Sequence, residues 1–123
     1  MADNPVPWFE IYVQDMERAR RFYEGVFEVT LERLPAEGIE MWAFPMVAKG
    51  PGAAGALVRM EGVEPGGGGT LVYFRCDDCS IEEGRAAASG GRVLRPKTPI
   101  GEWGFMSLVA DTEGNVVGLH SNR

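Results

Sequence analysis

The sequence predicts an α+β fold that consists of two βαβββ modules in a single domain. A strand pattern followed by an amphipathic helix opens the chain, and the same order returns after a glycine-rich run. Aligning Val13-Gln-Asp15 with Cys76-Asp-Asp78 gives an offset of 63 positions, about half of the 123 residues. A period this long indicates a duplicated unit rather than a solenoid.

The first module is expected to begin with a strand over Trp8–Val13, because these residues are mostly aromatic or β-branched. Asp15 then occupies the N-cap position of a helix. The helix should bury one apolar face, because its apolar residues recur at intervals of three or one positions. This face comprises Met16, Ala19, Phe22, Tyr23, Val26 and Phe27. Three strands are expected after it, at Thr30–Leu34, Glu40–Phe44 and Gly55–Met60.

The second module follows a flexible run, Glu64–Gly69, and repeats the order of the first. A strand is expected over Leu71–Cys76, then a helix capped by Asp78 that ends before Gly90-Gly91. The remaining strands are predicted at Arg92–Leu94, Phe105–Ala110 and Val116–His120. We therefore expect modules at about residues 7–62 and 70–123, joined by a linker at about 63–69.

The charge balance disfavours polyanionic partners. The chain has 12 basic and 18 acidic residues, a net charge of −6, which argues against nucleic acid or an anionic membrane surface. No apolar run approaches the roughly 18 residues of a membrane span, and the start of the chain does not look like a signal peptide. We expect a cytoplasmic protein.

Two short motifs have simple structural interpretations. The segment Gly50–Gly55 matches G-x-G-x-x-G, but a strand pattern rather than a helix follows, which favours a turn over a phosphate loop. Cys76 and Cys79 form a C-x-x-C motif whose two intervening aspartates disfavour a reactive thiolate. No second ligand pair accompanies it, so core packing is favoured over redox or zinc chemistry.

Nearly the whole chain resembles the vicinal oxygen chelate superfamily, which includes glyoxalase I, bleomycin-resistance proteins and extradiol dioxygenases. It is similar to the short, single-domain branch related to lactoylglutathione lyase. The matching segments are Trp8–Asp15, Arg21–Phe27, Gly55–Val58, Leu71–Phe74 with Asp77-Asp78, Ala88–Leu94 and Ala110–Ser121. The resemblance implies that both modules curl a mixed sheet around a cavity, and that the protein forms a homodimer.

Metal-dependent members of the superfamily place one ligand on the first strand and one on the last strand of each module. Carried over to this chain, the resemblance puts these positions at Trp8, one of Ala56–Val58, Leu71 and Gly118. None of these side chains has a lone pair suited to a metal. We therefore expect no metal site and no cofactor.

Side chains on a strand alternate between its two faces, so the residues two positions along share the face of each ligand position. Glu10 and His120 then lie about 7 Å from two of these positions, and we take them as candidate catalytic residues. A structural hydrogen bond or exposure at the rim is the alternative for both. Candidate substrate-binding residues are Trp8, Tyr12, Leu71, Tyr73, Arg75 and Trp103. Trp103 belongs to the segment Lys97–Gly104, which is either a lid or an ordinary loop.

Three functions fit these features. The first is a metal-independent protein that binds or sequesters a small organic molecule. The second is a lyase or isomerase that uses Glu10 and His120 as acid and base on an oxygenated substrate. The third is a metalloenzyme in which Glu10 and His120 from two chains act as shifted ligands.

Overall fold

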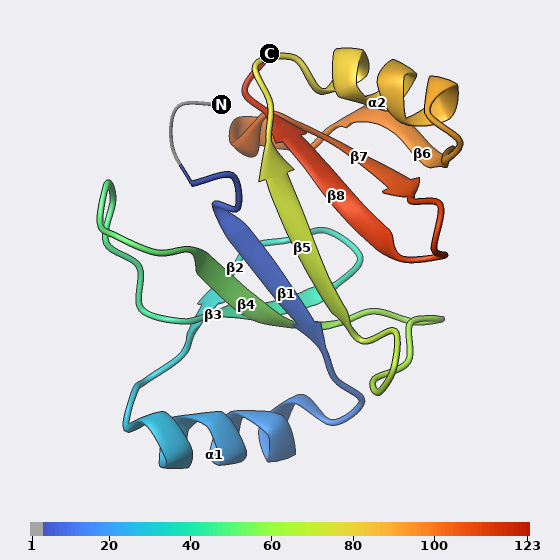
Figure 1. Ribbon diagram of the computed structural model, residues 1–123. Helices are drawn as coiled ribbons and strands as arrows, with labels where there is room; N and C mark the ends of the chain where they lie inside the picture. Colours follow the sequence, from blue (N-terminus) through green and yellow to red (C-terminus); the bar gives the residue numbers. More distant parts are fainter. Residues whose placement is uncertain (1–3) are drawn as a thin grey trace. The chain divides into compact units, whose positions relative to one another are not determined.

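The computed structural model describes residues 4–123, which divide into two compact units. One unit is Trp8–Thr70, and the other is Leu71–Arg123 together with the segment that ends at Pro7. Each contains one α-helix and four strands in the order βαβββ, which confirms the predicted α+β class and the duplicated module (Figure 1). Neither α-helix in the described part of the chain has the length and apolar character needed to cross a membrane.

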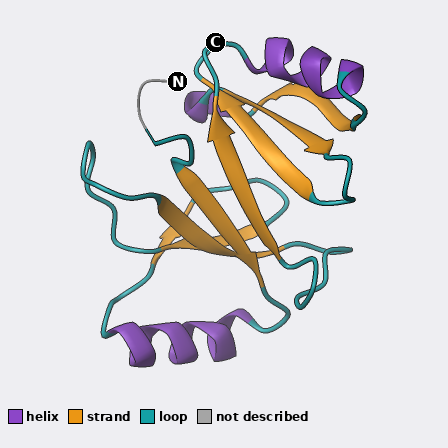
Figure 2. Cartoon of the chain, in the orientation of Figure 1, coloured by secondary structure: helices purple, strands orange, loops and turns teal. Residues whose placement is uncertain are grey.

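The first module pairs its strands in the order β2-β3-β4-β1. Strands β1 and β4 run parallel, and the other neighbours run antiparallel. Because a parallel connection needs a crossover, the intervening chain carries the helix that covers one face (Figure 2). The elements are β1 (Trp8–Tyr12), α1 (Met16–Phe27), β2 (Glu32–Leu34), β3 (Glu40–Ala43) and β4 (Ala54–Arg59).

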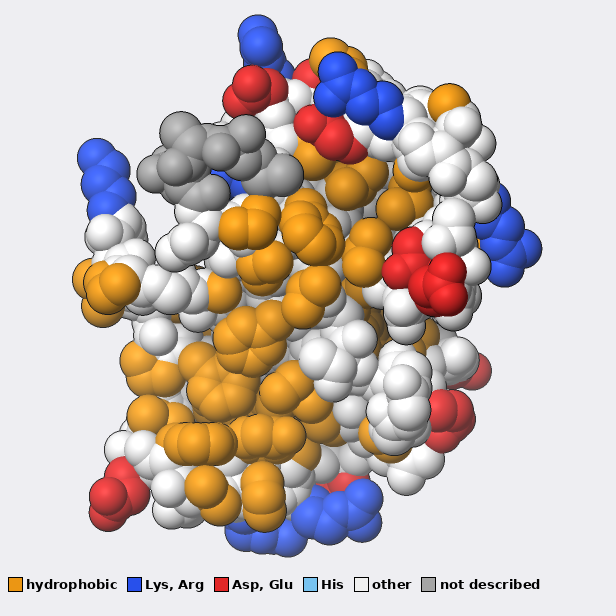
Figure 3. Space-filling view, viewed as in Figure 1, with side chains coloured by type: hydrophobic (Ala, Val, Ile, Leu, Met, Phe, Trp, Pro, Cys, Tyr) orange, Lys and Arg blue, Asp and Glu red, His pale blue; other side chains and the backbone are white. Residues whose placement is uncertain are grey.

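Helix α1 begins as predicted, but the face that it buries is narrower than predicted. The Asp15 carboxylate accepts the backbone N–H of Arg18 at 3.0 Å, which caps the helix. Met16, Ala19 and Tyr23 pack into the core. The other apolar residues of the predicted face stay largely exposed to solvent. Phe22 is 60% exposed, Val26 is 56% exposed and Phe27 is 60% exposed. Figure 3 shows hydrophobic side chains at the surface in the lower part of the view, where Figure 1 places α1.

A charged residue explains the orientation of α1. The guanidinium of Arg20 lies 3.6 Å from the ring centroid of Trp42, and it pairs with Glu24 at 3.4 Å. A cation over an indole face is attracted by the ring quadrupole, whose negative part lies on the face of the ring. Arg20 therefore takes part of the inward face of α1, and the apolar residues on the far side of the helix stay exposed.

The second module repeats the arrangement, with strand order β5-β8-β7-β6 and a parallel pair formed by β5 and β8. Its helix covers a core of Cys76, Cys79, Val109 and Leu119. The elements are β5 (Thr70–Arg75), α2 (Cys79–Ala88), β6 (Arg92–Pro99), the 3₁₀-helix η1 (Gly101–Trp103), β7 (Phe105–Ala110) and β8 (Val116–Ser121).

The C-x-x-C cysteines pack as expected. Cys79 is fully buried and Cys76 is 8% exposed, and both belong to the core beneath α2. Burial, and after it the nearby carboxylate of Glu82, together raise the pKa of the Cys76 thiol to about 12. A thiol that stays protonated near neutral pH is a poor nucleophile and a poor metal ligand.

The segment Lys97–Gly104, expected to be a lid or an ordinary loop, is a connection only in part, because β6 is longer than predicted. Lys97–Pro99 belong to β6, where Thr98 pairs with Met106 in β7. The backbone N–H of Lys97 donates to the Glu83 carboxylate at 2.6 Å, a bond from α2 that the sequence pattern does not show. Only Ile100–Gly104 connects the strands, and Ile100 N–H donates to the Gly104 carbonyl at 2.8 Å.

Candidate functional site

In the first module, three predicted site residues lie together on one face of β1. Ile11 packs under α1, so Trp8, Glu10 and Tyr12 occupy the opposite face. Glu10 is only 7% exposed. Its Oε2 accepts the indole N–H of Trp8 at 3.1 Å, and its Oε1 accepts the hydroxyl of Tyr12 at 2.7 Å. The structure thus brings this part of the predicted site together.

This arrangement holds a buried carboxylate in a fixed position. Burying a carboxylate is costly unless donors replace its water, and here two side chains on the same strand do so. The rings of Trp8 and Tyr12 flank the charge with apolar surface. A polar anchor within an aromatic wall is the usual make-up of a small-molecule site.

In the second module, the predicted residues of β5 and β8 also share one face. Tyr73 pairs with Gly118, and Arg75 pairs with His120, in the parallel register. Phe74 and Leu119 belong to the core cluster covered by α2, so these four residues lie on the face that points away from the helix. Leu71 lies on the same face and is 7% exposed, while Arg75 is exposed.

The ring of Tyr73 occupies the space where a side chain at residue 118 would lie. A Cβ atom added to Gly118 would lie 2.3 Å from Cδ1 of Tyr73, closer than real side chains approach. The Tyr73 side chain is itself buried, with 8% exposed. Glycine therefore lets the ring lie directly on β8, and no larger side chain fits there unless the ring moves.

His120 is linked to the connection between β6 and β7. Its Nε2 lies 2.5 Å from the carbonyl oxygen of Trp103. Because a carbonyl only accepts, Nε2 is the donor in this contact, and Nδ1 is not engaged by it. The Trp103 side chain is 51% exposed, so the indole does not cover a buried site within this module.

The metal implied by the superfamily does not fit the residues at its expected positions. The Trp8 indole only donates and is engaged with Glu10, and Leu71 offers no donor atom. Ala56, Leu57 and Val58 are buried apolar residues, and the space at Gly118 is filled by Tyr73. Within residues 4–123, no three His, Cys, Asp or Glu side chains come together as a metal site would require.

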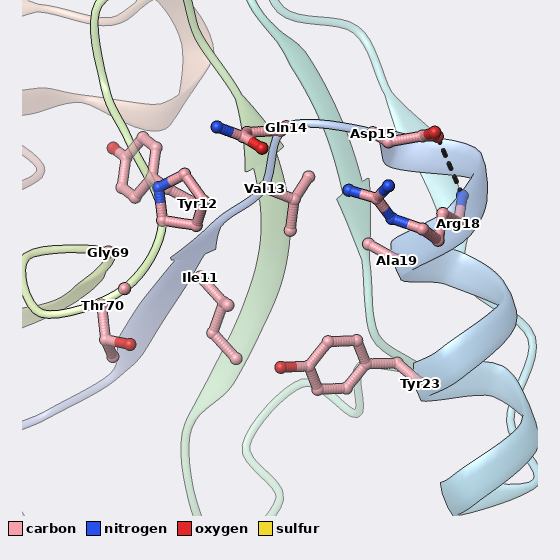
Figure 4. Close-up of a pocket in the computed structure, with 12 residues that line it drawn as sticks. Ile11, Tyr12, Val13, Gln14, Asp15, Arg18, Ala19, Tyr23, Gly69 and Thr70 are labelled. Atoms are coloured by element: carbon pink, nitrogen blue, oxygen red, sulfur yellow. Dashed lines mark hydrogen bonds between the residues drawn. The ribbon is translucent and has the colours of Figure 1, made fainter.

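The first module also contains a pocket that the sequence did not predict. It has a volume of about 310 Å³ and lies between the end of β1, the start of α1 and the glycine run (Figure 4). Its apolar wall includes Ile11, Val13 and Ala19. The polar groups on its lining come from Gln14, Asp15, Arg18, Tyr23 and Thr70.

The glycine run forms one wall of this pocket because it folds back on the strand. Gly69 N–H donates to the Gly66 carbonyl at 3.0 Å, and the Gly69 carbonyl accepts the N–H of Tyr12 at 2.7 Å. The glycine content of this run predicts a flexible linker, but it does not show which carbonyl a strand will use. The sequence feature that could have indicated the pocket is Arg18, a basic residue close to the N-cap of α1.

Fold and site together define a two-module α+β protein with an aromatic, carboxylate-bearing sheet face. Residues 6–119 match the family model of the Glyoxalase/Bleomycin resistance protein/Dioxygenase superfamily, so the chain belongs to this superfamily. A protein of Mycobacterium bovis named "Putative glyoxylase CFP32" is 28% identical over 119 residues. That match covers 94% of this chain but only 45% of the relative, so the chain spans about half of the relative's length.

Solved structures share the fold. A variant of Streptomyces coelicolor methylmalonyl-CoA epimerase in complex with 2-nitronate-propionyl-CoA aligns with a TM-score of 0.68 and 16% identity, over 94% of this chain and 92% of that one. The methylmalonyl-CoA epimerase of Mycobacterium tuberculosis aligns with a TM-score of 0.65 and 16% identity, over 97% and 88% of the two chains. At this identity the likeness concerns the fold alone.

Proposed function

We propose that this protein binds a small organic molecule without a metal at the positions that metal-dependent relatives use. The observation that carries the proposal is the Trp8–Glu10–Tyr12 cluster, a buried carboxylate held by two aromatic donors. Trp8 and Tyr12 offer ring surface to the ligand, and Glu10 fixes the orientation of its polar group. Within the second module, Leu71, Tyr73 and Arg75 are proposed to contact a ligand on the face that points away from α2.

Binding is favoured over acid–base catalysis by the hydrogen bonds of the two candidate catalytic residues. Both oxygens of Glu10 already accept a side-chain donor, and Nε2 of His120 is engaged with the Trp103 carbonyl. Lone pairs remain on both Glu10 oxygens and on Nδ1 of a neutral His120 ring, but these bonds fix the orientation of both side chains, and a general base must be able to reach the substrate proton. Groups that are already paired serve better as fixed polar contacts.

The proposal is tested by thermal-shift screening of a metabolite library in buffer that contains a chelator. A ligand that binds only the native state raises the melting temperature, and the increase grows with the logarithm of the ligand concentration relative to Kd. We expect hits with the natural protein that are lost or strongly weakened in Glu10→Gln. If every hit requires added metal, or if hits shift both proteins equally, the proposal is wrong.

A second candidate is a lyase or isomerase that acts on a small oxygenated substrate with Glu10 and His120 as acid and base. One observation favours it: the fold is shared with methylmalonyl-CoA epimerases, which are isomerases by name. Incubation of each screening hit with the protein, followed by mass spectrometry and NMR, separates the two functions. Turnover that disappears in both Glu10→Gln and His120→Asn supports the enzyme, whereas tight binding without turnover supports the binding protein.

The homodimer and the cytoplasmic location expected from the sequence are also part of this proposal. The resemblance to the superfamily supports the dimer, and the composition supports the location. Size-exclusion chromatography with light scattering tests the dimer, which predicts twice the mass of one chain. Fractionation of the source cells tests the location.

A further inference from the structure

We propose that the pocket beside α1 is a second binding site, separate from the Glu10 face, for a small carboxylate with an apolar body. The pocket lies wholly within the first module, among Ile11–Asp15, the first two turns of α1 and the glycine run. It shares Tyr12 with the Trp8–Glu10–Tyr12 cluster, but neither Trp8 nor Glu10 lines it. Its volume of about 310 Å³ lies at the lower end of ligand pockets, which span roughly 300–1,000 Å³. A compact ligand is therefore expected.

The charge preference of the pocket comes from Arg18. Within residues 4–123, the Arg18 guanidinium makes no hydrogen bond or ion pair, although it is on the pocket lining. Figure 4 shows this guanidinium pointing towards Val13, into the space between strand and helix. A planar guanidinium fork matches the two oxygens of a carboxylate.

The nearby acids are used elsewhere or point away. Figure 4 shows the Asp15 carboxylate directed away from the pocket, where it accepts the Arg18 N–H at 3.0 Å. Glu64 accepts the side-chain amide of Gln14 at 2.8 Å, and Glu17 pairs with Arg21 at 3.4 Å. Because the helix end is already capped by Asp15, the anion preference depends on the guanidinium rather than on the helix N-terminus.

The opposite side of the pocket accepts an apolar body and one hydrogen bond. Ile11, Val13 and Ala19 supply aliphatic surface. The ring of Tyr23 is held edge-on against Phe44 with centroids 5.8 Å apart, and its hydroxyl points towards Ile11 in Figure 4. A single cation, a hydroxyl and an aliphatic wall together match a monoanionic aromatic or branched aliphatic acid better than a multiply charged phosphate.

Sodium benzoate and its neutral isostere benzamide are the probes, and amide NMR spectra of the labelled full chain are the readout. Benzoate is expected to shift the resonances of Ala19, Gly69 and Thr70, with benzamide binding at least about tenfold more weakly. Arg18→Gln should weaken benzoate about tenfold or more, and Arg18→Lys should fall between the two. Arg21→Gln is the matched control on the same helix, and it should bind benzoate as the natural protein does.

The same spectra show whether each variant is folded, so lost binding is not confused with lost structure. The proposal is overturned if benzoate and benzamide bind equally, or if Arg18→Gln binds benzoate as tightly as the natural protein. It is also overturned if the shifts map to Trp8 and Glu10, or if Glu10→Gln abolishes them. Loss of the thermal-shift hits in Glu10→Gln with retained benzoate binding would support both proposals separately.

Discussion

Tyr73 occupies the space that any side chain at residue 118 would need, since a Cβ atom on Gly118 would lie 2.3 Å from Cδ1 of the ring. The two residues are neighbours in the parallel pair of β5 and β8, on the face that points away from α2. The resemblance to metal-dependent members implies a ligand position at residue 118, and the Tyr73 ring occupies the space of any side chain there. Glycine at residue 118 thus offers no ligand atom and leaves room for the Tyr73 ring, which agrees with the expected lack of a metal site.

Gly118→Ala should destabilise the fold. Overpacking a well-filled position costs about 1–3 kcal/mol, and the contact here is with a buried ring rather than a flexible chain end. Urea unfolding measures the change. Tyr73→Ala removes the ring that a Cβ atom on residue 118 would meet. Gly118→Ala should therefore lower the free energy of unfolding clearly less in the Tyr73→Ala variant than in the natural protein. Additive effects of the two substitutions would contradict the account.

Gly84→Ala is the matched control, because nothing lies within 4 Å of a Cβ at that position in α2. Alanine in a helix interior is favoured over glycine by about 0.5–1 kcal/mol, so this variant should unfold at a higher urea concentration. A destabilised Gly84→Ala would show that α2 is packed differently.

Glu10→Leu should cost about 1–3 kcal/mol, because it leaves the donors of Trp8 and Tyr12 without their acceptor. Glu10→Gln should cost much less, since an amide oxygen still accepts the indole N–H and the amide N–H₂ can donate to the Tyr12 hydroxyl. Urea unfolding compares the two. Equal stability of both variants would mean that the carboxylate is not anchored by these donors.

Neither cysteine should react with Ellman's reagent in the native protein at pH 8. Both thiols are buried, and burial raises the pKa of Cys76 to about 12, so little thiolate forms. Both should react once the protein is unfolded in guanidinium. A fast native reaction of either thiol would contradict the packing found beneath α2.

The stability of the second module should fall with acid through Asp78. The hydrogen bond from Lys97, at 2.9 Å, and those from Ser80 lower the pKa of Asp78 from 3.8 to about 2. A carboxyl whose folded pKa is lowered stabilises the fold above its unfolded pKa and loses this contribution as the pH falls towards the folded value.

Asp78→Asn should therefore flatten the dependence of unfolding free energy on pH between about 4 and 2, as urea titrations at several pH values would show. Lys97→Met, which removes the largest cause of the shift, should flatten it in the same direction. An unchanged slope in both variants would show that this pair does not couple to folding.

Local signals in the sequence predicted much of the fold. Asp15 and Asp78 cap the two helices as expected, because an aspartate oxygen reaches a nearby backbone N–H in the first turn. Strand β7 has the predicted bounds, since Phe105–Ala110 is apolar apart from Ser107 and is followed by polar turn residues. The shared face of Trp8, Glu10 and Tyr12 followed from strand alternation alone.

The features that were missed depend on contacts between distant residues. The packing of Arg20 on Trp42 turns α1 and exposes Phe22, which periodicity alone assigned to the core. The bond from Lys97 to Glu83 extends β6 beyond its predicted end. The pocket near Arg18 exists because the glycine run folds back, which no local pattern encodes.

The most direct test of metal-independent binding is the metal content of the protein purified without chelator, measured by inductively coupled plasma mass spectrometry. Because Trp8, Leu71 and Gly118 offer no ligand and Tyr73 fills the last position, we predict only substoichiometric transition metal. One equivalent of zinc, nickel, cobalt or iron that is lost in Glu10→Gln or His120→Asn would contradict the account. Such a result would instead support a metalloenzyme with shifted ligands.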